Sequence, residues 1–267
     1  MPQSLPRLIG LPYDASSSHL RGAAEAPRVI RAALHSSAGN SWTEDLRDIG
    51  APGVLADAGD LDLPPTDKTR ALIEAGIASL LSDDARPLAL GGDHSVTHPV
   101  VRAVSAVHGP LTILHVDAHP DLYEEFDGDR HSHACPFARI MEEGLADRLV
   151  QVGIRATNGH QRAQADRYGV EVIDMRAWQS GARPTLGGNV YVTIDVDGID
   201  PAHAPGVSHR EPGGLTVRDV LGLVQGAKGV LVGADIVEFN PSQDVGRLTA
   251  HVAAKLVKEV AARMLAG

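Results

Sequence analysis

Leu111-Thr-Ile-Leu-His-Val-Asp-Ala-His-Pro-Asp121 is an apolar, strand-sized run that ends in three ionisable side chains. Their spacing of two places Asp117, His119 and Asp121 on one face if the chain stays extended. Three such groups at one strand end would repel one another or be desolvated unless a cation lay among them. Ligands of open parallel sheets also bind at the carboxyl ends of the strands. A polar loop with an Asx-turn is the alternative interpretation.

Two further segments repeat this design. Val190-Tyr-Val-Thr-Ile-Asp-Val-Asp197 is an apolar strand that closes on two carboxylates, whereas Asp200 precedes a proline and suits a turn better than a ligand. The strand-like run 87–90 leads into Gly91-Gly-Asp-His-Ser95, which offers His94 where glycines allow the backbone to approach closely. Carboxylates and imidazoles without a thiolate favour Mn²⁺ and are less typical of Zn²⁺. Two such ions could lie ~3.5–4 Å apart and share one hydroxide.

The rest of the chain alternates short β-type runs with amphipathic stretches, which is typical of βαβ units around a parallel sheet. The loop 199–214 is longer than a simple connection needs, so we expect it to line a site. Helices are expected where apolar residues recur at helical spacing. The expected strands are 7–10, 87–90, 111–116, 149–154, 170–173, 190–196 and 230–237, and the expected helices are 67–81, 96–107, 217–225 and 246–265.

Composition limits the classes of partner. With 267 residues, 43% of them hydrophobic, the chain is long enough for one large α/β domain. A net charge of -10 argues against nucleic acid and anionic membrane surfaces, and 3% aromatic residues argue against base stacking. Cys135 is the only cysteine, and the N-terminal residues do not resemble a signal peptide. These features predict a soluble, cytoplasmic protein.

Taken together, these segments resemble those of the ureohydrolase family, the arginases and agmatinases, from Gly10 almost to the end of the chain. The similarity is greatest to the plant-type arginase branch. It implies an α/β, three-layer αβα arginase-like fold with a central, mainly parallel sheet, formed by a single domain over residues 1–267. It also implies a homo-oligomer, either a trimer or a hexamer. The segments that carry the resemblance are 16–27, 117–123, 132–141 and 204–214.

The resemblance assigns roles to the strand-end side chains. Two Mn²⁺ ions per chain are expected, with Asp117 and Asp195 as ligands that bridge them. The first ion would be bound by His94, Asp117, Asp121 and Asp195, and the second by Asp117, His119, Asp195 and Asp197.

The implied reaction is hydrolysis of a guanidino group to urea and an amine by a metal-bridging hydroxide. Asp121 would hydrogen-bond this hydroxide, His133 would shuttle a proton and Glu238 would bind the guanidinium. Without the resemblance, His133 would be interpreted as a surface histidine and Glu238 as a solvated or capping acid. Cys135 is interpreted as a small buried residue at a helix start, and His115 as a satisfied core histidine.

The substrate is less closely defined by the sequence. Animal-type arginases have an asparagine where this chain has Tyr123, and His160 departs from an expected acidic residue. Arg155 and Arg162 are candidates to bind a carboxylate, but we favour structural roles for them, paired with nearby acids. We expect the substrate to be L-arginine, which would be converted to L-ornithine and urea. The alternatives are agmatine and a guanidino acid other than arginine. Tyr123, His133 and Glu238 are the expected substrate-binding residues. A zinc-dependent deacylase and a catalytically silent scaffold are the rival interpretations.

Overall fold

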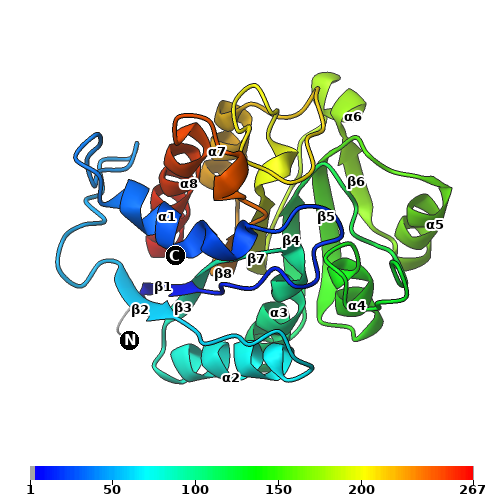
Figure 1. The fold of residues 1–267 in the computed structure, drawn as a ribbon, viewed down its shortest axis with the longest axis horizontal. Coiled ribbons are helices and arrows are strands. Elements are labelled where there is room, and N and C mark those ends of the chain that lie inside the picture. The colour runs from blue at the N-terminus through cyan, green and yellow to red at the C-terminus, as the bar shows by residue number, and fades with distance from the viewer. Residues whose placement is uncertain (1–3, 267) are drawn as a thin grey trace.

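Apolar runs of β-branched residues form the strands of a single sheet. In the computed structural model, which describes residues 4–266, eight strands are ordered β2-β1-β3-β8-β7-β4-β5-β6, and each neighbouring pair is parallel (Figure 1). The central strands are buried on both faces, as near-continuous hydrophobic runs predict for a parallel sheet. The strands are β1 (Pro6–Gly10), β2 (Ala56–Asp60), β3 (Arg86–Leu90), β4 (Leu111–Val116), β5 (Ala146–Ile154), β6 (Glu171–Asp174), β7 (Asn189–Asp195) and β8 (Val230–Val237).

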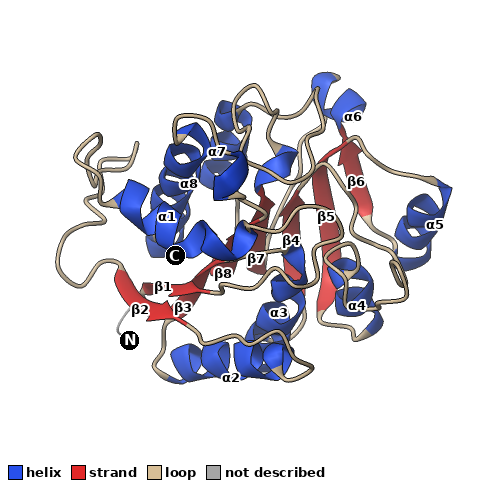
Figure 2. Cartoon of the chain, viewed as in Figure 1, coloured by secondary structure: helices blue, strands red, loops and turns tan. Residues whose placement is uncertain are grey.

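Helices cover both faces of this sheet (Figure 2). Alternate residues of β4 belong to two cores: Leu111 and Ile113 belong to the core that contains residues of α2, α3 and α4. Leu114 and Val116 belong to the core that contains residues of α1, α7 and α8. The predicted three-layer αβα fold is therefore confirmed. In the described part of the chain the α-helices are α1 (Ala26–Leu34), α2 (Thr69–Ser82), α3 (Thr97–His108), α4 (Pro136–Glu142), α5 (Gly159–Tyr168), α6 (Met175–Gln179), α7 (Val217–Gly226) and α8 (Leu248–Leu265).

Agreement with the predicted elements is best where burial is greatest. β4 and β8 have their predicted bounds, and α8 begins at Leu248 because the Asp244 carboxylate accepts hydrogen bonds from the N–H groups of Thr249 and Ala250. The prediction missed the exposed edge strand β2, whose sequence Ala-Asp-Ala-Gly-Asp has no strong strand former. It also named no helix at α1, α5 or α6, whereas the helix start expected at Cys135 is that of α4.

The strand order brings the site together. β3, β8, β7 and β4 are consecutive in the sheet, so the segments that follow their carboxyl ends lie at one edge. Those segments begin with the sequence motifs that contain His94, Glu238, Asp195 and Asp117, respectively. None of the helices found between residues 4 and 266 has the length and apolar character that a membrane crossing requires.

Candidate metal centre

The first group of candidate ligands surrounds one imidazole nitrogen. His94 Nδ1 lies 3.2 Å from an oxygen of Asp117, 3.0 Å from one of Asp121 and 3.2 Å from one of Asp195. All four side chains are buried, and their donor atoms lie within 4.8 Å of one another. The structure thus brings together the four residues predicted for the first ion.

The second group lies on the other side of Asp117. His119 Nδ1 is 3.4 Å from Asp117 Oδ1 and 3.2 Å from Asp197 Oδ2. Asp195 is not in this group: its Oδ1 accepts a hydrogen bond from the Asp197 N–H at 2.8 Å, and its Oδ2 faces His94. Asp117 is therefore the residue that both groups share in the structure, whereas both Asp117 and Asp195 were predicted to bridge.

The atoms of the first group fit a metal ion better than they fit one another. His94 Nε2 lies 3.1 Å from the Thr193 hydroxyl, so this nitrogen has a hydrogen-bond partner. His94 Nδ1 makes no hydrogen bond despite the three carboxylate oxygens around it. A ring nitrogen without a hydrogen bond of its own, directed at converging carboxylates, is the arrangement of a metal ligand whose other nitrogen is fixed by a hydrogen bond.

The charges in the cluster are unbalanced. Burial, with the neighbouring charges of Asp197 and Asp117, raises the pKa of Asp195 well above its ordinary value. Burial also raises the pKa of Asp197 to about 6. A divalent cation among these oxygens would offset both the desolvation and the repulsion, and oxygen with imidazole ligands suits Mn²⁺.

His133 and Glu238 form a pair beside the metal groups. His133 Nδ1 lies 3.1 Å from Glu238 Oε1, and its Nε2 lies 2.8 Å from the Ser18 hydroxyl. Burial alone would lower the pKa of His133, but the hydrogen bond and charge of Glu238 outweigh it and raise the pKa to about 9. His133 is 9% exposed and Glu238 is 2% exposed, so neither is the solvated residue that sequence position alone suggests.

Two carboxylates of the site have strained backbones. Asp121 has φ of 49° and Glu238 has φ of 62°, in the left-handed region that side chains rarely adopt. Such a conformation costs on the order of 1 kcal/mol and persists only where the surroundings enforce it. For Glu238, the surroundings include the His94 N–H, which donates to Oε1 at 2.9 Å.

A cavity of about 370 Å³ opens onto both metal groups and onto the His133–Glu238 pair. The described residues that line it include no arginine or lysine. The predicted loop 199–214 supplies part of the wall, which confirms its expected position. Further side chains of the lining are Ser18, Phe126, Thr157, Asn158, Gln161, His209 and Glu211.

The arginines proposed for a substrate carboxylate do not line this cavity. Arg155 donates to the carbonyl oxygens of Gly153, Asp197, Gly198 and Glu211 at 2.6–3.1 Å, so its guanidinium is used to hold the backbone. Arg162 is exposed on α5.

Of the two rings singled out in the sequence, Tyr123 lines the cavity and His160 packs against it from the exposed side. Tyr123 and His160 stack with centroids 5.5 Å apart, and the Tyr123 hydroxyl accepts a hydrogen bond from Asn158 Nδ2 at 2.6 Å.

Three other interpretations can be checked. Asp200 is a turn residue, because its carboxylate accepts hydrogen bonds from Ala202, Gly213 and Gly214. Cys135 is buried directly before α4, and burial raises the pKa of its thiol to about 12, which makes it a poor nucleophile. His115 is buried, but it is more than a core residue because its Nε2 lies 2.7 Å from Asp117 Oδ2.

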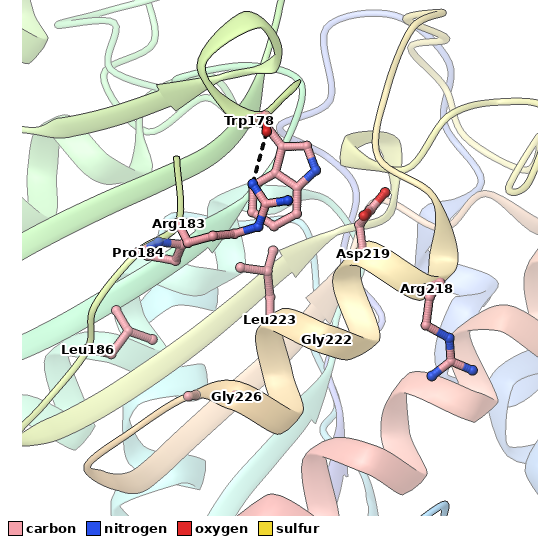
Figure 3. Close-up of a pocket in the computed structure, with 10 residues that line it drawn as sticks. Trp178, Arg183, Pro184, Leu186, Arg218, Asp219, Gly222, Leu223 and Gly226 are labelled. Atoms are coloured by element: carbon pink, nitrogen blue, oxygen red, sulfur yellow. Dashed lines mark hydrogen bonds between the residues drawn. The ribbon is translucent and has the colours of Figure 1, made fainter. Parts of the chain in front are cut away.

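A second cavity, of about 330 Å³, lies away from these groups between the segment 178–186 and α7 (Figure 3). The guanidinium of Arg183 lies 3.6 Å from the centre of the Trp178 ring, and α7 contributes Gly222 and Gly226 to the wall. Among residues 4–266, no histidine or cysteine lines this cavity, and it shares no residue with the metal groups.

Known proteins with similar sequences and structures support the predicted resemblance. The family model described as "Arginase family" matches residues 6–262. Arginase 1, mitochondrial, of Arabidopsis thaliana is 48% identical over 275 residues, which cover 96% of this chain and 80% of that protein. The solved structure of the arginase from Medicago truncatula has a TM-score of 0.93 at 46% identity, covering 98% of this chain and 87% of that chain. The mitochondrial agmatinase of Gallus gallus is less similar, at 35% identity over 94% of this chain and 78% of that protein.

The expected cytoplasmic location is contradicted by these comparisons. Similar plant arginases carry names that place those proteins in mitochondria, or in chloroplasts and mitochondria, rather than in the cytoplasm. The prediction was wrong because charge, cysteine content and hydropathy describe the chemistry of the chain, and the same chemistry suits several compartments.

Proposed function

This chain belongs to the arginase family, and we propose that it hydrolyses L-arginine to L-ornithine and urea with two Mn²⁺ ions per chain. The observation that carries the proposal is the pair of His/Asp groups that share Asp117, with the His133–Glu238 pair in the same cavity. Arginase is favoured over agmatinase because the plant arginases are 44–48% identical to this chain, against 35% for the agmatinase.

The metal ions would be bound by the residues of the two groups. His94, Asp121 and Asp195 would bind the first ion, His119 and Asp197 the second, and Asp117 both. A second bridge through Asp195 stays a prediction. When bound, the ions lower the pKa of a shared water molecule so that hydroxide is available near neutral pH.

Glu238 is suited to hold the guanidinium of the substrate. Its Oε1 is occupied by the His94 N–H and by His133, and no described residue donates to its Oε2. A buried carboxylate oxygen that is free in this way can accept from the planar N–H fork of a guanidinium, and the charge-assisted bond fixes the guanidinium carbon in place.

His133 and Asp121 are the residues suited to proton transfer. Because the Glu238 carboxylate only accepts, His133 Nδ1 donates to it, and Nε2 beside the Ser18 hydroxyl is the atom that exchanges a proton with the departing amine. Asp121 lines the cavity next to the first metal group, where its carboxylate can accept a hydrogen bond from the attacking water.

The tail of the substrate would meet neutral groups. Since no arginine or lysine is among the described lining residues, the carboxylate of arginine would be held by hydroxyl and amide donors such as Ser18 and Gln161. Tyr123 remains a predicted contact. Agmatine is the competing substrate. It lacks the carboxylate, so it could bind in the same cavity without hydrogen bonds from Ser18 or Gln161.

One experiment separates these possibilities. After Mn²⁺ loading, we expect the purified protein to bind two ions and to release urea from L-arginine faster than from agmatine. Urea from agmatine alone would replace the substrate but keep the reaction class. One Zn²⁺ without urea release would support the deacylase, and no metal binding would support the silent scaffold.

The proposal treats residues 1–267 as one ureohydrolase domain, supported by the single sheet and by a family match over residues 6–262. It also retains the expectation of a homo-oligomer, a trimer or a hexamer, which sedimentation equilibrium of the Mn²⁺-loaded protein would measure.

A further inference from the structure

A row of polar side chains crosses the middle of the sheet next to the metal groups. In register across neighbouring strands, Gln151 of β5 pairs with His115 of β4, His115 pairs with Thr193 of β7, and Thr193 pairs with Asp235 of β8. All four are fully buried. Asp117 and Asp195 come two residues after His115 and Thr193. Buried polar groups at the centre of an apolar sheet are costly unless they are hydrogen-bonded, so their partners are informative.

The hydrogen bonds of Gln151 determine which nitrogen of His115 carries the proton. Gln151 Nε2 lies 2.6 Å from the carbonyl oxygen of Pro120 and 3.0 Å from His115 Nδ1. A carbonyl only accepts, so the atom that faces Pro120 must be the amide nitrogen. His115 Nδ1 faces this same donor and must therefore accept. The proton of the neutral ring is then on Nε2, which donates to Asp117 Oδ2 at 2.7 Å.

Packing keeps the ring of His115 in this orientation. Phe137 stacks on it with centroids 3.9 Å apart and planes 24° apart, and the same phenyl ring meets His94 edge-on at 5.2 Å. Phe137 is fully buried at the start of α4. The imidazole therefore cannot turn away from Asp117 without displacing a packed aromatic side chain.

The two oxygens of Asp117 face different metal groups. Oδ2 accepts from His115 and lies 3.2 Å from His94 Nδ1, whereas Oδ1 accepts from the His119 N–H at 2.6 Å and lies 3.4 Å from His119 Nδ1. Each oxygen thus has one fixed donor and one neighbour among the candidate ligands. This is the orientation that a carboxylate shared by two ions requires.

We infer that Gln151 and His115 form a positioning relay that holds Asp117 with one oxygen toward each metal group. The inference rests on the proposed function, because it assigns the relay to the metal centre of that function. His115 contributes an N–H donor to the carboxylate without adding a positive charge, and Gln151 keeps the donor on the correct nitrogen. His115 also lies within reach of an ion beside His94 and Asp117. Because its Nε2 proton donates to Asp117, we assign neither His115 nor Gln151 a place among the metal ligands or the substrate contacts. Losing such a partner typically weakens metal affinity about 10–100-fold.

The test measures Mn²⁺ binding by the metal-free protein, with calorimetry for affinity and electron paramagnetic resonance for the number of bound ions. His115→Leu keeps the bulk of the ring but removes the donor, and we expect its Kd for Mn²⁺ to rise about 10–100-fold. His115→Gln retains an N–H donor at a similar reach and should recover most of the affinity. Equal affinities of these two variants would overturn the inference.

A matched control uses a second buried histidine. His98 is 5% exposed and hydrogen-bonds Glu143 at 3.0 Å, outside the metal groups. His98→Leu should lower the melting temperature but leave the Kd for Mn²⁺ unchanged. Circular dichroism and thermal melting of every variant, without metal, distinguish a lost relay from a lost fold.

A double-mutant cycle tests whether Gln151 acts through His115. Gln151→Leu alone should weaken Mn²⁺ binding, but it should cost little further affinity in the His115→Leu protein, because the relay is already broken. Additive losses would contradict the relay. If the wild-type protein binds two Mn²⁺ ions and His115→Leu binds them as tightly, the relay fails while the proposed function stands. If the wild-type protein binds no Mn²⁺, the proposed function itself fails.

Discussion

Two clusters of acidic and basic side chains in this protein differ in how their charges are balanced. In the metal centre, Asp117, Asp121, Asp195 and Asp197 face imidazoles, those of His94, His115 and His119, and no arginine or lysine among the described residues pairs with them; the pKa values of Asp195 and Asp197 are raised. The second cluster, which we call the α7–α8 cluster, consists of Glu44, Arg218, Gln225, Lys255 and Glu259. Each carboxylate of that cluster has a cationic partner and an amide partner.

The α7–α8 cluster is a structural network. Arg218 binds both oxygens of Glu44 at 2.7 and 2.9 Å, and the hydrogen bond from Arg218 is the main reason why the pKa of Glu44 is well below its ordinary value. Lys255 Nζ lies 2.6 Å from Glu259 and 3.3 Å from Glu44. Both clusters contain acidic and basic side chains, so the presence of these residue types alone does not identify the metal site. An excess of buried carboxylates that protein cations do not balance marks the place where a metal ion belongs.

The largest expected effect follows from removing one of the unbalanced carboxylates. Asp195→Asn should abolish urea release and reduce the bound Mn²⁺, because the first metal group loses a charged ligand. Metal analysis after gel filtration and a urea assay measure both quantities. Undiminished Mn²⁺ stoichiometry would show that Asp195 is not a ligand.

His133→Asn tests the part of the site that handles protons. We expect two Mn²⁺ ions to remain bound while kcat falls about 10²–10⁴-fold, which is the usual contribution of a positioned acid or base. Steady-state urea release and metal analysis separate the two outcomes. His98→Asn is the control, since His98 contacts Glu143 rather than the cavity, and a normal kcat for His133→Asn would remove the proton-transfer role.

The unbalanced centre also predicts a pH dependence of the metal-free protein. With a pKa raised from 3.8 to about 6, the folded state keeps a proton on Asp197 that the unfolded state has released, so stability declines as pH rises from about 4 through 6. Asp197→Asn, which cannot ionise, should therefore stabilise the metal-free protein at pH 7.5 by on the order of 3 kcal/mol but change little at pH 3.5, below both pKa values. Urea denaturation at both pH values measures this. The same stabilisation at both values would show that ionisation of Asp197 is not its cause.

The sequence predicted the metal centre but not the α7–α8 cluster, because the candidate metal ligands follow recognisable strands. The candidate ligands follow buried apolar strands at a spacing of two, and the parallel sheet then brings the strand ends together. β4 and β8 could be assigned with their bounds for a related reason: a strand that is buried along most of its length consists mainly of apolar residues. The exposed strand β2 carries no such pattern, because solvent does not select apolar residues at an edge.

The remainder of the site depends on contacts that no local pattern encodes. Ser18 reaches His133 from 115 positions away in the sequence, and no spacing rule connects them. Gln161 is on α5, a polar helix without a clear apolar stripe. His115 was interpreted as a core histidine because its partner Gln151 is on another strand, and only the register of β4 with β5 brings the two together.

The smallest expected effect comes from the balanced cluster and has the opposite sign to that of Asp197→Asn. Glu259 is 2% exposed and accepts from Lys255, from Gln225 and from the Glu44 N–H at 3.0 Å, so Glu259→Gln removes a buried charge that already has its partners. We expect a loss of about 1 kcal/mol in the free energy of unfolding, with Lys255 retaining Glu44 as a partner. Mn²⁺ binding and kcat should not change.

The control for this prediction is an exposed ion pair of the same chemistry. Glu25 and Arg28 lie 3.1 Å apart with side chains that are 64% and 73% exposed, so Glu25→Gln should change the free energy of unfolding by less than about 0.5 kcal/mol. Urea denaturation of both variants at pH 7.5 provides the comparison. Stabilisation by Glu259→Gln would contradict this prediction, because it would mean that the charges of the α7–α8 cluster are unbalanced as well. Charge balance would then no longer distinguish a structural network from a metal site.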